Sequence, residues 1–176
     1  MKIEFISPSN IKDVKLNCLI LWTDEGLKLF DKEVHGLIKN EDEFLYRQFR
    51  DKKTLSNNNI LFCAGIENKI DSYVLGNIYY EGNNITTLEN TLKSINKLTK
   101  YIDIININSI GVLKPKMKIS DNSIRNNTLL FTSILKSFKE NDKLKKIYFI
   151  TEDIQDIKLI KKINFLLKIP FIKRFV

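Results

Sequence analysis

Apolar residues alternate or cluster in six short segments that predict β-strands. The segments are 2–6, 16–22, 60–66, 73–80, 102–107 and 146–150. The apolar run within Leu16–Trp22 is typical of a strand buried on both faces, so it is expected at the centre of a sheet. The polar residues Thr23–Gly26 follow it and are expected to form a turn at the carboxyl end of that strand.

Apolar residues at helical spacing predict helices between these strands. The first helical segment spans 30–49, which Gly36 and the acidic patch 41–43 can divide into two helices. A capping box, Thr86 to Glu89, opens the next helix, with Leu88, Leu92, Ile95 and Leu98 on one face. Two more helices carry inward residues: Leu130, Ile134 and Phe138 after a cap at Asp121 or Ser123, and Ile157, Ile160, Ile163 and Leu167 after a cap at Thr151.

The order of these elements predicts an α/β fold. Strands that alternate with helices indicate a mostly parallel sheet covered on both faces, a three-layer α/β/α sandwich. Consecutive strands without a helix between them indicate antiparallel pairing at one side of a mixed sheet. No repeat or linker interrupts the pattern, so residues 1–176 are expected to form a single domain, with 108–120 as a loop that contains Gly111 and Pro115.

The composition is that of a folded, non-membrane protein. Hydrophobic residues make up 43% and charged residues 28% of the 176 residues. No apolar run reaches the length of a membrane span, and the first residues have no secretory apolar core. Cys18 and Cys63 both lie in apolar runs, which favours buried thiols in a cytoplasmic protein.

Positive charge is concentrated at the end of the chain. The formal net charge is +8, and residues 136–176 hold eleven Lys/Arg against five Asp/Glu. Such an end attracts nucleic acid, anionic lipid or an acidic partner, or it is a solvated helix face with a charged tail. The basic and aromatic tail 168–176 is interpreted first as a segment that docks on the domain or on a second copy, and second as a nucleic-acid contact.

The sequence lacks the residues of several catalytic classes. Its one histidine, His35, lies in a helical pattern, and neither cysteine has zinc-ligand spacing. Neither common glycine-rich phosphate loop is present. We therefore predict no catalytic residue, no metal site and no bound cofactor, and the chain is expected not to be an enzyme.

The segment 3–29, IEFISPSNIKDVKLNCLILWTDEGLKL, followed by DKEVHGLI at 31–38, resembles the macro-domain fold. The likeness is greatest to the N-terminal domain of leucyl (cytosol) aminopeptidases. In that family a separate C-terminal domain with two metal ions carries the peptidase chemistry, and its signature is absent from this chain. The resemblance implies a free-standing, non-catalytic interaction or oligomerisation module with a homo-oligomer or protein partner.

Macro domains that bind ADP-ribose imply a second set of candidate residues. Their adenine-binding Asp-Ile pair matches Asn10 and Ile11, and the loop after their buried strand matches Leu21–Asp24. Their second phosphate loop matches Ser109–Pro115, with Lys114 in place of a glycine, where its ammonium could act as a point charge beside phosphate. The resemblance therefore implies a nucleotide site at Asn10, Ile11, Asp24, Ser109, Ile110, Gly111, Val112 and Lys114. The alternative function is ADP-ribose or nucleotide binding, with weak ADP-ribosyl hydrolysis.

Overall fold

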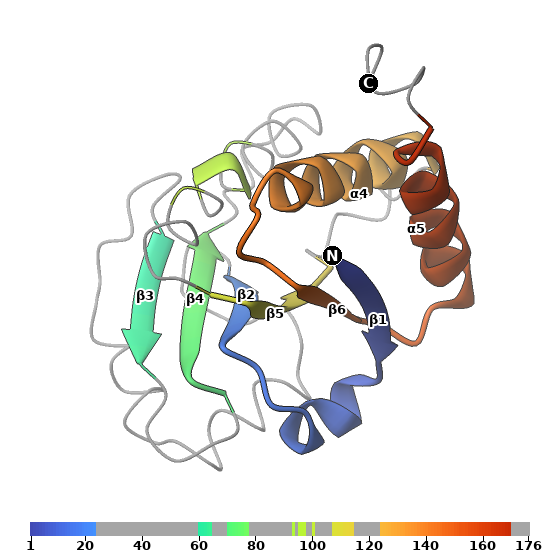
Figure 1. The fold of residues 1–176 in the computed structure, drawn as a ribbon. Coiled ribbons are helices and arrows are strands. Elements are labelled where there is room, and N and C mark those ends of the chain that lie inside the picture. The colour runs from blue at the N-terminus through green and yellow to red at the C-terminus, as the bar shows by residue number, and fades with distance from the viewer. Residues whose placement is uncertain are drawn as a thin grey trace, which may run out of the picture.

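The computed structural model describes residues 1–23, 60–64, 70–77, 93, 95–97, 100, 107–114 and 124–169. Their strands form one six-stranded sheet in the order β1-β6-β5-β2-β4-β3 (Figure 1). The strands are β1 Lys2–Ile6, β2 Cys18–Thr23, β3 Ile60–Ala64, β4 Ser72–Asn77, β5 Ser109–Leu113 and β6 Lys146–Ile150. A 3-10 helix, η1 Pro8–Asp13, follows β1, and the two long helices are α4 Ile124–Lys139 and α5 Ile154–Leu166.

The pairing confirms a mixed, mostly parallel sheet. β1, β6, β5, β2 and β4 pair in parallel along the sheet, and only the β3–β4 pair within the described strands is antiparallel. The predicted central position of the second strand is confirmed, because β2 lies between β5 and β4. Leu16 falls just outside β2 and forms an isolated bridge with Ile70.

The loop predicted at 108–120 is wrong over Ser109–Leu113, which forms β5, in register with both β2 and β6. The strand predicted at 102–107 lies, apart from Ile107, outside the described residues and stays a prediction. Gly111 and Pro115 suggested a loop, but the run Ile110–Leu113 is buried in the middle of the sheet. Tertiary burial has therefore overridden the local signal of a glycine.

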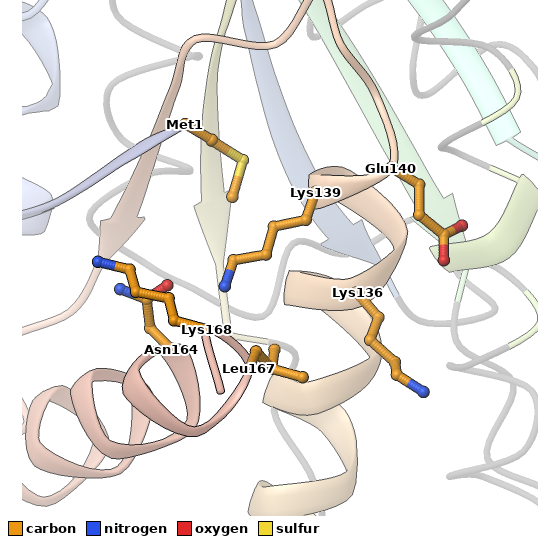
Figure 2. Close-up of a pocket in the computed structure, with 7 residues that line it drawn as sticks. All are labelled: Met1, Lys136, Lys139, Glu140, Asn164, Leu167 and Lys168. Carbon is orange, nitrogen blue, oxygen red and sulfur yellow. The ribbon is translucent and has the colours of Figure 1, made fainter. Parts of the chain in front are cut away.

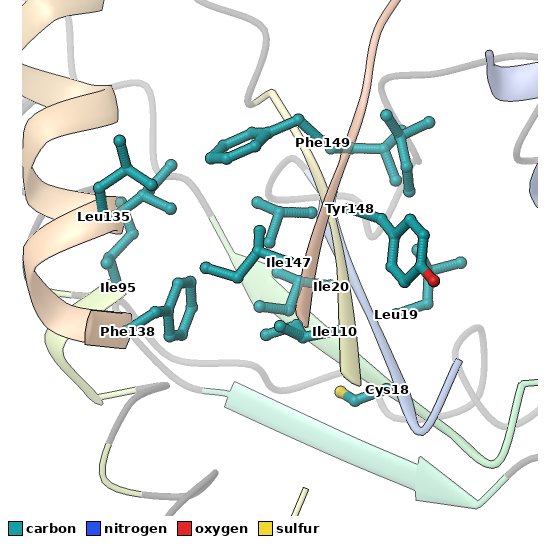
Figure 3. Close-up of a cluster of buried hydrophobic side chains, with 14 of the residues drawn as sticks. Cys18, Leu19, Ile20, Ile95, Ile110, Leu135, Phe138, Ile147, Tyr148 and Phe149 are labelled. Atoms are coloured by element: carbon teal, nitrogen blue, oxygen red, sulfur yellow. The ribbon is translucent and has the colours of Figure 1, made fainter. Parts of the chain in front are cut away.

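One face of the sheet packs on α4 and α5. The ring of Phe149 on β6 stacks with Phe5 on β1 at a centroid distance of 6.2 Å and meets the edge of Phe131 on α4 at 5.9 Å. On the same face, the Lys161 ammonium of α5 lies 5.6 Å from the centroid of the Phe5 ring. Figure 3 shows Ile95, Leu135 and Phe138 in the adjoining part of this core.

Helix α4 has the predicted inward face, since Leu130, Ile134 and Phe138 are all buried. Its predicted caps, Asp121 and Ser123, lie outside the described residues, as does the helical segment 30–49. Residues 93, 95–97 and 100 are helical, which agrees with the helix expected after the capping box. No helix in the described ranges is long and apolar enough to span a membrane.

Helix α5 begins two residues later than its predicted cap implies. The Asp153 side chain is the N-cap and accepts from the Gln155 backbone N–H at 2.8 Å. Thr151 instead accepts through Oγ1 from the Asp153 backbone N–H at 3.1 Å, so it shapes the turn before the cap. Both residue types are good caps, and a carboxylate gains more from the positive end of the helix.

At the amino ends of the strands, the Asn17 side chain joins three chain segments. Its Oδ1 accepts from the backbone N–H of Ser109 at 3.1 Å and of Asn108 at 3.4 Å. Its Nδ2 donates to Asp71 Oδ2 at 2.7 Å, and the backbone N–H of Asp71 donates to Leu16 O at 2.9 Å. This network fixes the register of β2 against β5 and the segment before β4.

Candidate functional site at the carboxyl edge of the sheet

The carboxyl ends of the five parallel strands meet at one edge of the sheet, which we call the carboxyl edge. The last strand residues there are Ile6, Thr23, Asn77, Leu113 and Ile150. β2 and β5 are neighbours, but the next strands in sequence lie on opposite sides: β3 and β4 beyond β2, and β6 beyond β5. Loops that leave two neighbouring parallel strands in opposite directions open a crevice, where ligands of α/β proteins bind. The topology therefore places the candidate site outside β2 and β5.

Two predicted site residues follow β1 at this edge. Asn10 and Ile11 lie in η1, which Ser7 begins as N-cap by accepting from the Ser9 backbone N–H at 3.3 Å. Ile11 is fully buried, whereas Asn10 is exposed. The backbone N–H of Asn10 donates to Ser7 O at 3.0 Å, which fixes the turn. The predicted pair is thus an apolar anchor beside an accessible amide.

The residue that follows β2 lies outside the described residues. Asp24 comes directly after Thr23, the last residue of that strand. Its role stays a prediction, and so does that of the rest of the turn Thr23–Gly26.

The predicted phosphate-loop residues lie inside the sheet. Ile110 and Val112 on β5 are buried in the core, and Ser109 lies at the opposite, amino end of that strand. A Cβ added to Gly111 would lie 2.8 Å from Leu16 Cδ1 and 2.9 Å from Leu19 Cδ1. The glycine therefore accommodates close packing of the core and does not form a loop, and Lys114 is the first residue after the strand.

Lys114 is held in an ion pair that sequence analysis did not find. Its Nζ lies 3.0 Å from Oδ1 and 2.9 Å from Oδ2 of Asp156 in the first turn of α5. Their side chains are 20% and 5% exposed, and Lys114 Nζ also lies 5.8 Å from the centroid of the Phe131 ring. The pair ties the end of β5 to the start of α5. No local signal could reveal it, because 42 residues separate the partners.

Burial dominates the electrostatics of this pair. Loss of water around the carboxyl raises the pKa of Asp156 above its ordinary value, while the hydrogen bond and charge of Lys114 oppose that shift. Because both carboxylate oxygens contact Lys114, much of the lysine charge is neutralised inside the protein. Lys114 is therefore better placed to fix the start of the loop than to serve as a free point charge.

A second link at this edge joins β1 to β6. The Thr151 backbone N–H donates to Ile6 O at 3.0 Å, and the Ser7 hydroxyl donates to the Glu152 carboxylate. The Ser7–Glu152 contact joins the N-cap of η1 to the residue before the α5 cap. Across the described ranges, no group of three or more His, Cys, Asp or Glu side chains is arranged to hold a metal ion.

Several solved structures share this fold. The Oceanobacillus iheyensis macrodomain with MES bound has a TM-score of 0.74 and 10% identity, covering 94% of this chain and 92% of that chain. The Trypanosoma brucei macrodomain in complex with ADP-ribose has a TM-score of 0.70 and 10% identity, covering 91% of this chain and 68% of that chain. The macrodomain of Thermus aquaticus DarG has a TM-score of 0.63 and 10% identity, covering 85% of this chain and 97% of that chain.

The chain has the macrodomain fold. The predicted α/β class with three α/β/α layers is therefore confirmed. No protein-family model matches the sequence, and no curated protein is similar to it in sequence. At such low identity, the macrodomain likeness establishes the architecture and leaves the ligand to be argued from the site.

Proposed function

We propose that this macrodomain-fold protein binds ADP-ribose or a closely related nucleotide at the carboxyl edge of the sheet. The observation that carries the proposal is the crevice topology, in which β2 and β5 are parallel neighbours whose chains continue to opposite sides. The ligand class is supported by the similar fold of a Trypanosoma brucei macrodomain solved in complex with ADP-ribose. Neither composition nor charge alone distinguishes this ligand from others.

Asn10 is the proposed adenine contact, and Ile11 positions it. The exposed Asn10 amide can both donate to and accept from the edge of a base, and Ile11 anchors the turn in the core. An aspartate at this position would offer only acceptors to the exocyclic amine of adenine. We therefore expect recognition of the base to persist, with lower affinity than a carboxylate would give.

Asp24 and Lys114, which directly follow β2 and β5, are the proposed diphosphate contacts. Backbone N–H groups at the ends of parallel strands suit phosphate oxygens. Lys114 positions the start of its loop through Asp156, so its contribution to affinity is expected to be indirect. Ser109, Ile110, Gly111 and Val112 lie in β5. The phosphate contact predicted for them is therefore assigned to the end of that strand, at Lys114.

Hydrolysis of an ADP-ribosyl bond is a further step that depends on this binding. The non-catalytic interaction module expected from the resemblance to leucyl aminopeptidases stays a prediction. Contact with a protein partner and self-association would both fit that module. Binding of ADP-ribose distinguishes nucleotide binding from the interaction module, because the module requires no ADP-ribose.

Calorimetric titration of the whole protein with ADP-ribose tests the proposal. We expect a micromolar dissociation constant, about −8 kcal/mol. The variant Asn10→Ala should weaken binding, whereas Lys158→Ala on the exposed side of α5 should not. Flat heats for the folded protein would contradict the proposal and favour the interaction module.

A further inference from the structure

A pocket of about 540 Å³ lies at the other end of the sheet, where the parallel strands begin. Its volume is within the range of roughly 300–1,000 Å³ of small-molecule sites. The lining comes from the start of β1 and from the ends of α4 and α5: Met1, Lys136, Lys139, Glu140, Asn164, Leu167 and Lys168. We call this set the amino-edge pocket. It shares no residue with the proposed ADP-ribose site.

The polar groups of the amino-edge pocket come from two helices. Figure 2 shows the Lys139 side chain extending from α4 toward Asn164 and Lys168 at the end of α5. Lys136 and Glu140 extend on the other side of α4 (Figure 2). Lys139 and Lys168 thus bring two ammonium groups, with the Asn164 amide, to one side of the pocket. This combination suits oxygens of an anion.

Positive charge extends beyond the lining. The pocket holds three lysines against one glutamate. The exposed Lys145 lies beside the start of β1, where its backbone carbonyl accepts from the Lys2 N–H at 2.7 Å, whereas the Lys2 ammonium is paired with the Glu4 carboxylate. Lysines in the last turn of α4 are explained by the negative end of that helix. Lys168 directly follows the C-cap of α5, so it also lies at the negative end of a helix, whereas Lys145 precedes β6 and has no such helix.

Apolar surface adjoins this charge. Leu167 is buried in the lining, and Met1 is 43% exposed beside it. Phe165, which is outside the lining, is 65% exposed on the last turn of α5, three residues before Lys168, and side chains at this spacing are neighbours on a helix surface. Exposed aromatic rings beside lysines are the combination with which proteins hold single-stranded nucleic acid, because rings stack on bases while ammonium groups contact phosphates.

We propose that the amino-edge pocket binds the phosphodiester backbone of a single-stranded nucleic acid, with Lys139 and Lys168 on phosphate and Phe165 against a base. Charge complementarity and the exposed ring favour this ligand over free phosphate, which needs no aromatic contact. They also favour it over an acidic peptide, which offers no base. The proposal is independent of ADP-ribose binding.

Fluorescence anisotropy with a labelled oligothymidylate of about 12 nucleotides tests this site. The variant Lys139→Glu with Lys168→Glu should lose at least about tenfold in affinity, and the log–log salt slope should fall by about 1.4, for two phosphate contacts at about 0.7 each. The charge-matched control is Lys12→Glu with Lys15→Glu, both exposed beyond the carboxyl end of β1. It should retain most of the affinity and the slope. Phe165→Ala should weaken binding without changing the slope.

Four outcomes would overturn the proposal. Equal loss in the pocket and control variants would assign binding to net charge. Equal affinity for polyglutamate, or full competition by thymidine monophosphate at constant ionic strength, would show that no nucleic-acid strand is recognised. No binding of the oligonucleotide at low salt would remove the site. The milder variant Lys139→Gln with Lys168→Gln, whose fold is checked by circular dichroism, should also lose affinity, which excludes a folding defect as the cause. Saturating ADP-ribose should leave the affinity for the oligonucleotide unchanged.

Discussion

The two edges of the sheet differ in charge for a reason that lies in helix direction. The carboxyl edge receives the start of α5, where Asp153 caps the helix and Asp156 lies in its first turn. The amino edge receives the end of α4, where the last turn carries Lys136 and Lys139. Acidic groups are stabilised at helix starts and basic groups at helix ends. A parallel sheet with returning helices therefore places acids at one edge and lysines at the other.

Charge alone therefore does not locate a ligand site in this fold. The carboxyl edge is where a nucleotide is proposed, yet the described acids there are engaged in a cap and an ion pair. The basic edge attracts anions more strongly, yet it lies at the starts of the strands. Each edge therefore makes separate predictions that variants can test.

The largest effect is expected from Gly111→Glu. The side chain would enter the core against Leu16 and Leu19 and bury an unpaired carboxylate. Overpacking and a buried charge together should lower the free energy of unfolding by about 4 kcal/mol or more. Circular dichroism and urea unfolding should show a largely unfolded chain.

The matched variant Gly111→Ala adds only a methyl group against movable Leu side-chain ends. It should cost about 1–2 kcal/mol and leave a folded protein. If Gly111→Glu instead kept full stability, Gly111 would belong to a loop at the crevice and not to β5.

The next largest effect is expected at the Lys114–Asp156 pair. Lys114→Met leaves the Asp156 carboxylate buried without its ammonium partner, which should cost about 2–3 kcal/mol near neutral pH. The double variant Lys114→Met with Asp156→Asn should recover part of that loss in urea unfolding. A double variant as unstable as the sum of both single variants would show that the pair does not act as a unit.

The same pair predicts a pH dependence. Burial raises the pKa of Asp156, so folding favours its protonated form. That contribution to stability is present below about pH 4, the ordinary range of an aspartate, and is lost as pH rises through the raised pKa. The stability of the wild type relative to Asp156→Asn should therefore fall as pH rises, when measured by urea unfolding. A relative stability that rises with pH would mean that Lys114 outweighs burial.

A smaller loss is expected from Asn17→Ala at the amino edge. The change removes the acceptor of the Ser109 and Asn108 backbone N–H groups and the donor to Asp71. The free energy of unfolding should fall by about 1–2 kcal/mol. Asn17→Asp keeps the acceptor but loses the donor and places a carboxylate beside Asp71, so it should also destabilise. Thermal unfolding that is unchanged in Asn17→Ala would show that this network is replaced by water.

The smallest effect is expected from Asn10→Asp in the proposed nucleotide site. Asn10 is exposed, so stability should not change. A carboxylate accepts more strongly from the amine of adenine, and ADP-ribose affinity should rise several-fold, about 1 kcal/mol. Calorimetry of both forms measures the change. Weaker binding by Asn10→Asp would mean that the diphosphate lies close enough to be repelled.

The amino-acid pattern predicted those elements whose local signal and tertiary environment agree. The alternation in Lys2–Ile6 was sufficient to predict β1, and the helical period predicted the face of α4 that the structure buries. β5 was missed because Gly111 is a loop signal locally and a packing requirement in the sheet. The cap of α5 was misplaced by two residues because Thr151 and Asp153 are both good caps.

The site was less predictable than the fold. Asn10 and Ile11 were predicted from a family resemblance along contiguous residues, and their role stays a prediction. Lys114 and Asp156 meet only after β5, α4, β6 and α5 have packed. The lysines of the amino-edge pocket likewise come from separate elements, so the sequence shows only their number. A local sequence pattern does not show which side chains from distant segments meet in the folded protein.

We propose that the two edges bind different ligands, and amide chemical-shift mapping by NMR can locate each ligand separately. With ADP-ribose, the amide resonances of Asn10, Ile11 and Lys114 should shift, and those of Lys139, Asn164 and Lys168 should not. With the oligothymidylate, the reverse should hold. Shifts of the same amides with both ligands, or shifts with ADP-ribose confined to the amino-edge pocket, would contradict this proposal.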